Sequence, residues 1–405
     1  MDAPDTEIAV IGAGIVGLAA ARSIASRTRS SPTVVEAENR VATHQTGHNS
    51  GVVHSGLYYR PGSSKALYCI DGREAIRRFC ERNGIPHECC GKVVVATSRE
   101  QLPALDELER RGTANGLQGL ERLDPAGLER VEPHVRGVAA LRVPQTGIVD
   151  FTRVARAMAA ELSTRGGSLL TGWRVRRVER LSDRFRLSSD GASLTCRHLV
   201  NCAGLQSDRV ARMCGVRPGL RIVPFRGEYY RLRPGRERLI RHLVYPVPDP
   251  RFPFLGVHFT RMIDGGVTAG PNAVLALDRN GYSRGSFSLR DALSIASYGG
   301  FWRLAARHWR AGLDEFRRSS SRPAFVGALR RLVPQLSPDD VEPHTAGVRA
   351  QAVAPDGRLL DDFHIIERER MLHVLNAPSP AATASLSIGE ALAERAARAF
   401  GLEHR

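Results

Sequence analysis

Residues 8–17 read IAVIGAGIVG, an apolar run followed at once by three glycines with the spacing G-x-G-x-x-G. The run favours a buried strand, and residues 18–24 favour a helix with a face of small side chains. Gly12 suits a tight turn, Gly14 lets the backbone approach a pyrophosphate, and Gly17 lets helix and strand pack closely. Free N–H groups at the helix N-terminus would favour the phosphates. The pattern predicts a Rossmann-type nucleotide-binding unit at the start of the chain.

An acidic residue at the end of a second strand completes this unit. The β-branched run Thr33-Val34-Val35 leads into Glu36, which lies nineteen residues after Gly17. A carboxylate there can accept hydrogen bonds from the adenosine ribose hydroxyls and disfavours a 2′-phosphate. A plain strand–turn–helix could also carry three glycines, but here every part falls at the required spacing. The motif alone does not separate NAD from FAD.

The segment after Glu36 resembles a known family. Residues 44–56 (HQTGHNSGVVHSG) are similar to the loop after the second strand in the D-amino-acid oxidase and glycine oxidase superfamily, and more narrowly in the L-2-hydroxyglutarate dehydrogenase/oxidase family. The resemblance extends from about residue 7 to about 395 and is looser between about 280 and 330. It is carried further by residues 224–229, 245–260, 270–275, 347–357 and 376–383. It implies an α/β fold, with a Rossmann-type FAD-binding domain and an interleaved α+β substrate domain.

The resemblance implies that FAD is the cofactor and suggests which residues contact it. One group lies in the loop after the second strand, a second at the end of a strand over residues 199–202, and a third before a helix that begins near residue 384. In that order they are Thr46, Gly47, Asn49 and Ser50; Ala203 and Gly204; and Pro380, Ala381, Ala382 and Thr383. The N-terminus of the last helix would stabilise negative charge on the reduced flavin. A capped C-terminal helix with an ordinary loop is the alternative.

Arginines are the candidates for binding an acid substrate. By resemblance to glycine oxidase, Arg349 would hold the substrate carboxylate in a bidentate fork, although a surface arginine is the simpler interpretation in so arginine-rich a chain. A dicarboxylate needs a second cation, for which Arg226 and Arg261 are candidates. Arg226 could equally brace the sheet or the flavin.

A base must accept the hydroxyl proton when a secondary alcohol loses hydride, and a neutral imidazole is the usual acceptor. Among thirteen histidines, His258 is preferred because it lies in a strand-like run that aligns with a substrate-facing strand in the relatives. His54 and His48, in the flavin-contact loop, follow in that order. A pKa near 6–7 is expected for this base. His44 matches a position where some superfamily members tether flavin, but no covalent link is predicted.

The resemblance implies oxidation of an L-2-hydroxy acid, with L-2-hydroxyglutarate as first choice, hydride transfer to flavin N5, and O₂ or a quinone as acceptor. The alternative is the same scaffold acting as an oxidase or oxygenase on an aromatic 2-oxo or amino acid in a specialised biosynthetic pathway. A flavoprotein without catalytic activity is a third possibility, disfavoured because every chemistry-bearing block is present.

Composition limits the other functions of this 405-residue chain. The net charge is +16, but the positive charge is scattered arginine, with Lys65 and Lys92 as the two lysines, so no nucleic-acid partner is predicted. The seven cysteines form no CxxC pair, which favours a reduced, cytoplasmic protein with no metal site. No apolar run approaches the roughly 20 residues of a membrane span, and no secretory signal is expected.

Chain order predicts an FAD-binding domain over 1–90, 145–215 and 340–405, and a substrate domain over 91–144 and 216–339. A helix is expected between Arg303 and Arg318, with Trp302, Ala305, Trp309, Leu313 and Phe316 on one face. Such a helix more often packs on its own domain than on lipid, but this combination of Trp and Arg also suits a helix at a membrane surface. Peripheral membrane contact therefore stays open.

Overall fold

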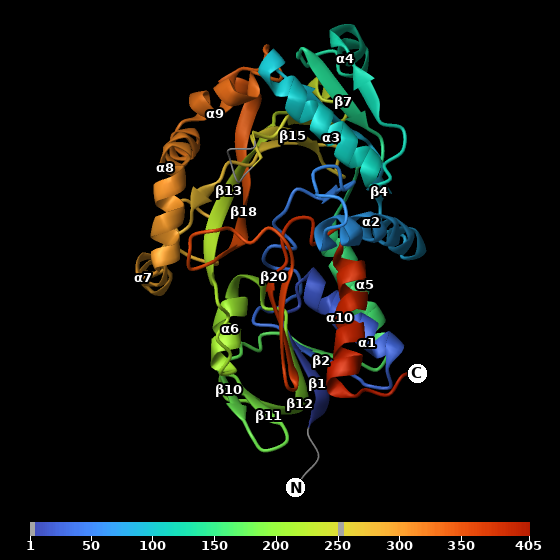
Figure 1. Cartoon of the computed structure of the whole chain (residues 1–405), viewed down its shortest axis with the longest axis vertical. Coiled ribbons are helices and arrows are strands. Elements are labelled where there is room, and N and C mark those ends of the chain that lie inside the picture. Colours follow the sequence, from blue (N-terminus) through green and yellow to red (C-terminus); the bar gives the residue numbers. More distant parts are fainter. Residues whose placement is uncertain (1–4, 250–254) are drawn as a thin grey trace.

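The computed structural model describes residues 5–249 and 255–405, and two large sheets organise them (Figure 1). The first sheet has the strand order β10-β11-β12-β1-β2-β9, with β20 beside β12 and β19 beside β20. Its strands are β1 Thr6–Ile11, β2 Thr33–Val35, β9 Ser168–Leu170, β10 Arg177–Arg180, β11 Phe185–Ser188, β12 Ser193–Asn201, β19 His364–Arg368 and β20 Met371–Asn376. The apolar runs predicted as the first two strands correspond to β1 and β2.

The centre of this sheet is parallel, as a Rossmann-type unit requires. Strand β1 pairs in parallel with both β12 and β2, and Ile11 lies opposite Asn201 on one side and Val35 on the other. The carboxyl ends of these strands therefore meet at one edge of the sheet, where ligands of open α/β sheets bind.

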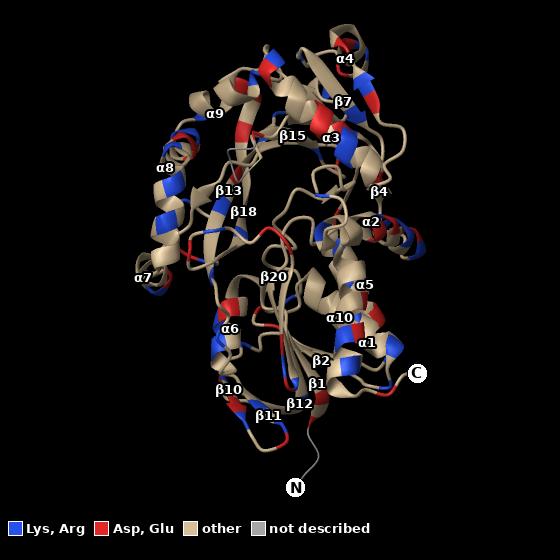
Figure 2. Cartoon of the chain, in the orientation of Figure 1, with Lys and Arg blue, Asp and Glu red and all other residues tan. Residues whose placement is uncertain are grey.

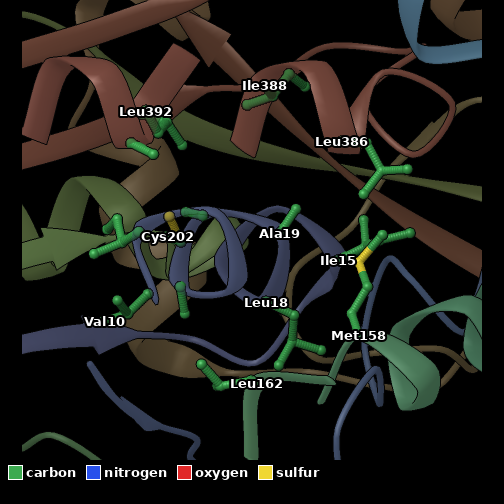
Figure 3. Packing of buried hydrophobic residues seen from close by; sticks show 14 of the residues in the cluster. Val10, Ile15, Leu18, Ala19, Met158, Leu162, Cys202, Leu386, Ile388 and Leu392 are labelled. Carbon is green, nitrogen blue, oxygen red and sulfur yellow. The ribbon is translucent and has the colours of Figure 1, made fainter. Parts of the chain in front are cut away.

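Three helices lie on one side of the first sheet, α1 Ile15–Arg27, α5 Phe151–Thr164 and α10 Ser385–Phe400, and α2 Ser64–Arg82 packs against α10. Their buried aliphatic side chains form one core with β1, in which Ile15 and Leu18 of α1 lie near Leu386 and Met158 (Figure 3). This core joins the N-terminal glycine turn to the C-terminal helix. As a result, the N-termini of α1 and α10 lie close together.

The second sheet has the order β17-β13-β16-β15-β14-β5-β7-β6, and β18 pairs with β13. Its strands are β5 Lys92–Ala96, β6 Glu121–Leu123, β7 Ala139–Val143, β13 Arg221–Leu232, β14 Leu243–Pro246, β15 His258–Arg261, β16 Val267–Gly270, β17 Val274–Leu275 and β18 Val341–Val353. A small sheet, β3-β8-β4, consists of β3 Val52–Val53, β4 His87–Glu88 and β8 Gly147–Val149. The remaining helices are α3 Leu102–Ala114, α4 Pro125–Val131, α6 Ser207–Met213, α7 Leu289–Ala296, α8 Gly299–Ser320 and α9 Arg322–Leu329.

Apart from β18, the strands of the two large sheets come from the chain segments that were predicted for the two domains. This strand pairs antiparallel with β13 from Val353 opposite Arg221 to Val341 opposite Leu232, so it belongs to the second sheet. The sequence placed residues 340–405 together because β18 leads directly into the strands and helix of the first sheet. The division into two domains stays a prediction, with residues 341–353 better grouped with the second sheet. Residues 250–254, within one of the matching blocks, lie outside the described ranges.

Helix α8 confirms the predicted helix, but its apolar face points outward. Leu304 is buried beside Val223 and Val353, whereas Trp302, Trp309, Leu313 and Phe316 are between 55% and 66% exposed. The helix packs on its own domain, as expected, but it does so through Leu304 and not through the predicted apolar face. No helix in the described part of the chain is long and apolar enough to cross a membrane.

Candidate active site

A cavity of about 460 Å³ brings many, but not all, of the predicted site residues together. It is lined by Gly14 to Val16 after β1, by Cys202 and Gly204 after β12, and by residues that follow β20. The second sheet contributes Tyr229, Tyr245, His258 and Arg349. The cavity thus lies where the carboxyl ends of the parallel strands meet, the expected ligand position in such a sheet.

The glycine turn has the geometry that its sequence predicts. Gly12 has φ +105°, and a Cβ there would lie 2.6 Å from the carbonyl oxygen of Cys202. A Cβ on Gly17 would lie 2.0 Å from the carbonyl oxygen of Gly12, so only glycine fits this close approach of helix and strand. Gly14 lines the cavity at the N-terminus of α1. The turn therefore presents backbone and a helix N-terminus to an anionic group.

Glu36 lies beside this turn but does not line the cavity. Its carboxylate is buried and accepts hydrogen bonds from the backbone N–H of Ala13, at 2.6 Å, and of Glu38, at 3.0 Å. These bonds hold the turn against the end of β2. Its contact with the ribose stays a prediction.

Of the flavin contacts predicted in the loop after β2, Thr46, Asn49 and Ser50 line the cavity. The Thr46 hydroxyl accepts a hydrogen bond of 3.0 Å from the backbone N–H of Ile15, which ties the loop to the start of α1. Gly47 is not among the lining residues, and a Cβ there would lie 2.4 Å from the carbonyl oxygen of Ala42. Its glycine is therefore explained by packing within the loop.

The second helix N-terminus facing the cavity belongs to α10. Pro380, Ala381, Ala382 and Thr383 all line the cavity just before this helix. The Thr383 hydroxyl donates to the carbonyl oxygen of Val52 at 3.2 Å and accepts from the N–H of His54 at 3.0 Å. From the other predicted pair, Gly204 lines the cavity and Ala203 does not. Two helix N-termini at one cavity fit a cofactor that carries a pyrophosphate and gains negative charge on reduction.

His258 lies on β15 with its ring stacked on Tyr245, the ring centroids 3.8 Å apart. Its Nδ1–H donates to the carbonyl oxygen of Gly256 at 2.8 Å, which leaves the lone pair on Nε2. Burial lowers the pKa of His258 to about 3, and the charges of Lys92 and Arg349 act in the same direction. The expected pKa of 6–7 is therefore wrong for this residue, because the ring is enclosed beside other positive charges.

The other two candidate histidines line the same cavity. Burial lowers the pKa of His54 to about 3, and its buried Nδ1 has no hydrogen-bond partner among the residues that the structure describes. His48 stacks on Tyr282 with centroids 4.0 Å apart, and its Nδ1 lies 3.0 Å from the carbonyl oxygen of Ala346. Burial also lowers the pKa of His48. His44 bonds Glu38 and Tyr282 instead and does not line the cavity.

Of the three candidate arginines, one lines the cavity and two do not. Arg349, on β18, lines the cavity beside Tyr229. Arg226 is buried, pairs with Glu228 at 3.0 Å and donates to the carbonyl oxygen of Ser283, so it braces the sheet and does not line the cavity. Arg261 pairs with Glu88 at 3.1 Å and also lies outside the cavity. The predictions for Arg226 and Arg261 as substrate ligands are therefore corrected.

Several cavity residues were not singled out from the sequence. Tyr229 and Tyr245 occur in the matching blocks but carry no signal that distinguishes them from core tyrosines. Lys65 also lines the cavity, and its Nζ lies 2.7 Å from Asp361. Its rarity, as one of two lysines, was the available signal. Within residues 5–249 and 255–405, no group of three or more His, Cys, Asp or Glu side chains could hold a metal ion.

Comparisons with known proteins agree with this site. The family model described as FAD dependent oxidoreductase matches residues 7–395. The L-2-hydroxyglutarate dehydrogenase of Indibacter alkaliphilus is 48% identical over 98% of this chain and 100% of its own length. The enzymes of the same name from Escherichia coli K12 and, mitochondrial, from Homo sapiens are 42% and 41% identical, over 95% and 98% of this chain and 91% and 89% of their own lengths.

Solved structures support the fold at lower identity. L-alpha-glycerophosphate oxidase from Mycoplasma pneumoniae, solved with FAD bound, has a TM-score of 0.79 at 19% identity and covers 98% of this chain and 95% of its own. Glycine oxidase from Geobacillus kaustophilus has a TM-score of 0.70 at 18% identity, over 96% and 95%. The predicted fold and the FAD cofactor are thereby confirmed. The chain is an FAD-dependent oxidoreductase, and it belongs to the L-2-hydroxyglutarate dehydrogenase family within the D-amino-acid oxidase superfamily.

Proposed function

We propose that this protein oxidises L-2-hydroxyglutarate to 2-oxoglutarate. The name of its relatives supports this substrate, since they match nearly the whole chain at 41–48% identity. The observation that carries the proposal is that Arg349 and His258 line the same cavity as the N-termini of α1 and α10. A cation for a carboxylate, a base for a hydroxyl and a cofactor cradle thus meet in one place.

Arg349 and His258 have different roles in the proposed reaction. Arg349 binds the carboxylate next to the reacting carbon, since its guanidinium matches a planar anion. The Nε2 of His258 accepts the hydroxyl proton, because its Nδ1 already donates to Gly256. FAD, held by the N-termini of α1 and α10 and by the loop after β2, would supply the two-electron oxidant that takes the hydride from the reacting carbon at flavin N5, with O₂ or a quinone as final acceptor. Loss of one proton and one hydride converts the alcohol into the ketone.

The second carboxylate of the substrate needs another cation. Arg226 and Arg261 are committed to Glu228 and Glu88, outside the cavity. Among the described lining residues, Lys65 is the cationic side chain besides Arg349. Its partner Asp361 is largely exposed, so this ion pair is weak and a substrate carboxylate can compete for the ammonium. We therefore place the distal carboxylate at Lys65.

Anaerobic mixing with candidate acids tests the proposed function. L-2-hydroxyglutarate should bleach the visible flavin band and yield 2-oxoglutarate, whereas its D-enantiomer should not. Bleaching only by an aromatic amino or oxo acid would move the protein to the alternative activity. A flavin that no acid reduces, in protein that dithionite does reduce, would contradict both.

We also propose that this cytoplasmic protein makes peripheral contact with a membrane through the exposed apolar face of α7 and α8, a contact that would favour a quinone as acceptor. Besides the four residues of α8, Leu289 and Leu293 of α7 are exposed. Arginines lie along the same two helices (Figure 2), among them Arg290 and Arg310. Bulky apolar side chains flanked by arginine are typical of helices that lie in the interface of anionic lipid.

Substitution of this face gives a measurable prediction. The double change Leu313→Glu with Phe316→Glu should lower binding to vesicles of anionic phospholipid about tenfold or more, because two apolar side chains no longer enter the lipid. Co-flotation with vesicles measures the bound fraction. Leu67→Glu is the control, since Leu67 is also more than half exposed but lies on α2. Equal flotation of all three proteins would contradict the membrane contact.

A further inference from the structure

Lys92 is a buried cation that the proposed reaction does not use. Its side chain is 1% exposed at the start of β5, and no carboxylate pairs with it among the described residues. Its Nζ lies 4.7 Å from the ring centroid of Tyr58 and 4.3 Å from that of Tyr245. A buried, unpaired ammonium is costly, and an apolar side chain would be the stable choice there. A lysine at this position therefore calls for a functional reason.

The sheet places Lys92 directly behind the proposed base. Strands β5, β14 and β15 are neighbours in that order and carry Lys92, Tyr245 and His258 respectively. The Tyr245 ring has the Lys92 ammonium nearby and the His258 imidazole stacked on it at 3.8 Å. Tyr245 and His258 line the cavity, whereas Lys92 does not. Lys92 can therefore influence the imidazole without touching the substrate.

We propose, building on the function proposed above, that Lys92 is a positioning residue whose charge, held against Tyr58 and Tyr245, sets how readily His258 accepts the hydroxyl proton of the substrate. A protonated amine behind the ring opposes formation of the imidazolium, and a neutral amine does not. The protonated form also holds the Tyr245 ring by a cation–π contact.

The surroundings of Lys92 place its titration near neutral pH. Burial lowers the pKa of Lys92 to about 7, and the thiols of Cys69 and Cys90 oppose this shift only in part. The titratable and charged groups around the Lys92–His258 pair are Tyr58, Cys69, Cys90, Tyr245, His54, Lys65 and Arg349. The amine is charged below about pH 7 and loses its charge above it. His258 should therefore become the better base as the pH rises through 7.

Two opposite variants separate this role from a structural one. In the parent enzyme the rate of flavin reduction should rise about three- to tenfold as pH increases through 7. Lys92→Met should hold the high rate across this range, because the charge is always absent. Lys92→Arg should hold the low rate, because the charge is always present. Substrate KM should change little in both, since Lys92 lies outside the cavity.

A measurement without substrate keeps this test separate from the proposed function. The NMR resonance of His258 Cε1 in the holoenzyme can be identified by its loss in His258→Gln. Its chemical shift should change by a small step near pH 7, caused by the titration of Lys92. The step should vanish in both Lys92 variants and persist in Lys65→Met, because Lys65 acts on His54 and not on His258. A step that survives in Lys92→Met, or a pH–rate profile equal to the parent's in both variants, would overturn the proposal. Failure of L-2-hydroxyglutarate to reduce the flavin would instead overturn only the proposed substrate.

Discussion

His258→Gln is expected to slow flavin reduction by about 10²–10⁴-fold, the usual loss when a general base is removed. Glutamine can still fill the space against Tyr245, but it has no nitrogen that accepts a proton at neutral pH. FAD content should stay at the parent level, since the cofactor cradle is built from α1, α10 and the loop after β2. Stopped-flow reduction under anaerobic conditions measures the rate, and the visible spectrum measures bound FAD.

The pH dependence makes this test more specific. The pKa of His258 is lowered to about 3 in the free enzyme, so the neutral, proton-accepting form is fully present above pH 5 and is lost only as pH falls toward 3. Protonation of His258 itself should therefore cause no fall in kcat/KM between pH 8 and 5. The negatively charged substrate favours the imidazolium and should therefore raise the pKa of His258 in the enzyme–substrate complex. The fall of kcat on acidification should accordingly occur at a higher pH than the fall of kcat/KM.

The same variant distinguishes among the three histidines. If His258 only bonds a carboxylate, His258→Gln should raise KM and leave the rate at saturating substrate close to the parent's. The base would then be His54, whose buried Nδ1 has no hydrogen-bond partner within residues 5–249 and 255–405, or His48. His54→Gln and His48→Gln, measured in the same way, would identify which of the two carries the proton transfer.

The parts of the fold that the sequence predicted well are those with local signals. The glycine turn, the strand before Glu36 and the start of α10 depend on residues a few positions apart, and each was found where expected. Strand β18 was grouped with the segments of the first sheet, whereas it pairs with β13 of the second, more than a hundred positions away in the chain. Such pairing leaves no pattern within the strand itself.

The roles of the charged residues were also difficult to predict from local sequence. Nothing local distinguishes Arg349, which lines the cavity, from Arg226 and Arg261, which are paired with glutamates. The pKa expected for His258 was wrong for a related reason. It depends on enclosure and on Lys92, which reaches the imidazole only because β5, β14 and β15 are neighbours in the sheet.

Arg349→Lys should lower kcat/KM for the acid substrate. The loss of transition-state stabilisation that this ratio measures should be about 2–4 kcal/mol, the scale for breaking a desolvated charge pair. Lysine keeps the positive charge but offers a single ammonium in place of the two parallel N–H groups that match a carboxylate. The loss should appear mainly in KM, with FAD content unchanged. Steady-state kinetics over a wide range of substrate concentration measures it.

Arg261→Lys is the matched control for this change. Both arginines lie on strands of the second sheet, but Arg261 pairs with Glu88 outside the cavity and is partly exposed. A lysine there can still reach the carboxylate of Glu88, and exposed pairs contribute little, so KM should stay at the parent value. If instead Arg261→Lys raised KM and Arg349→Lys did not, the substrate carboxylate would have to lie nearer β15 than the cavity lining indicates. The pair of variants therefore tests where the substrate binds as well as which arginine holds it.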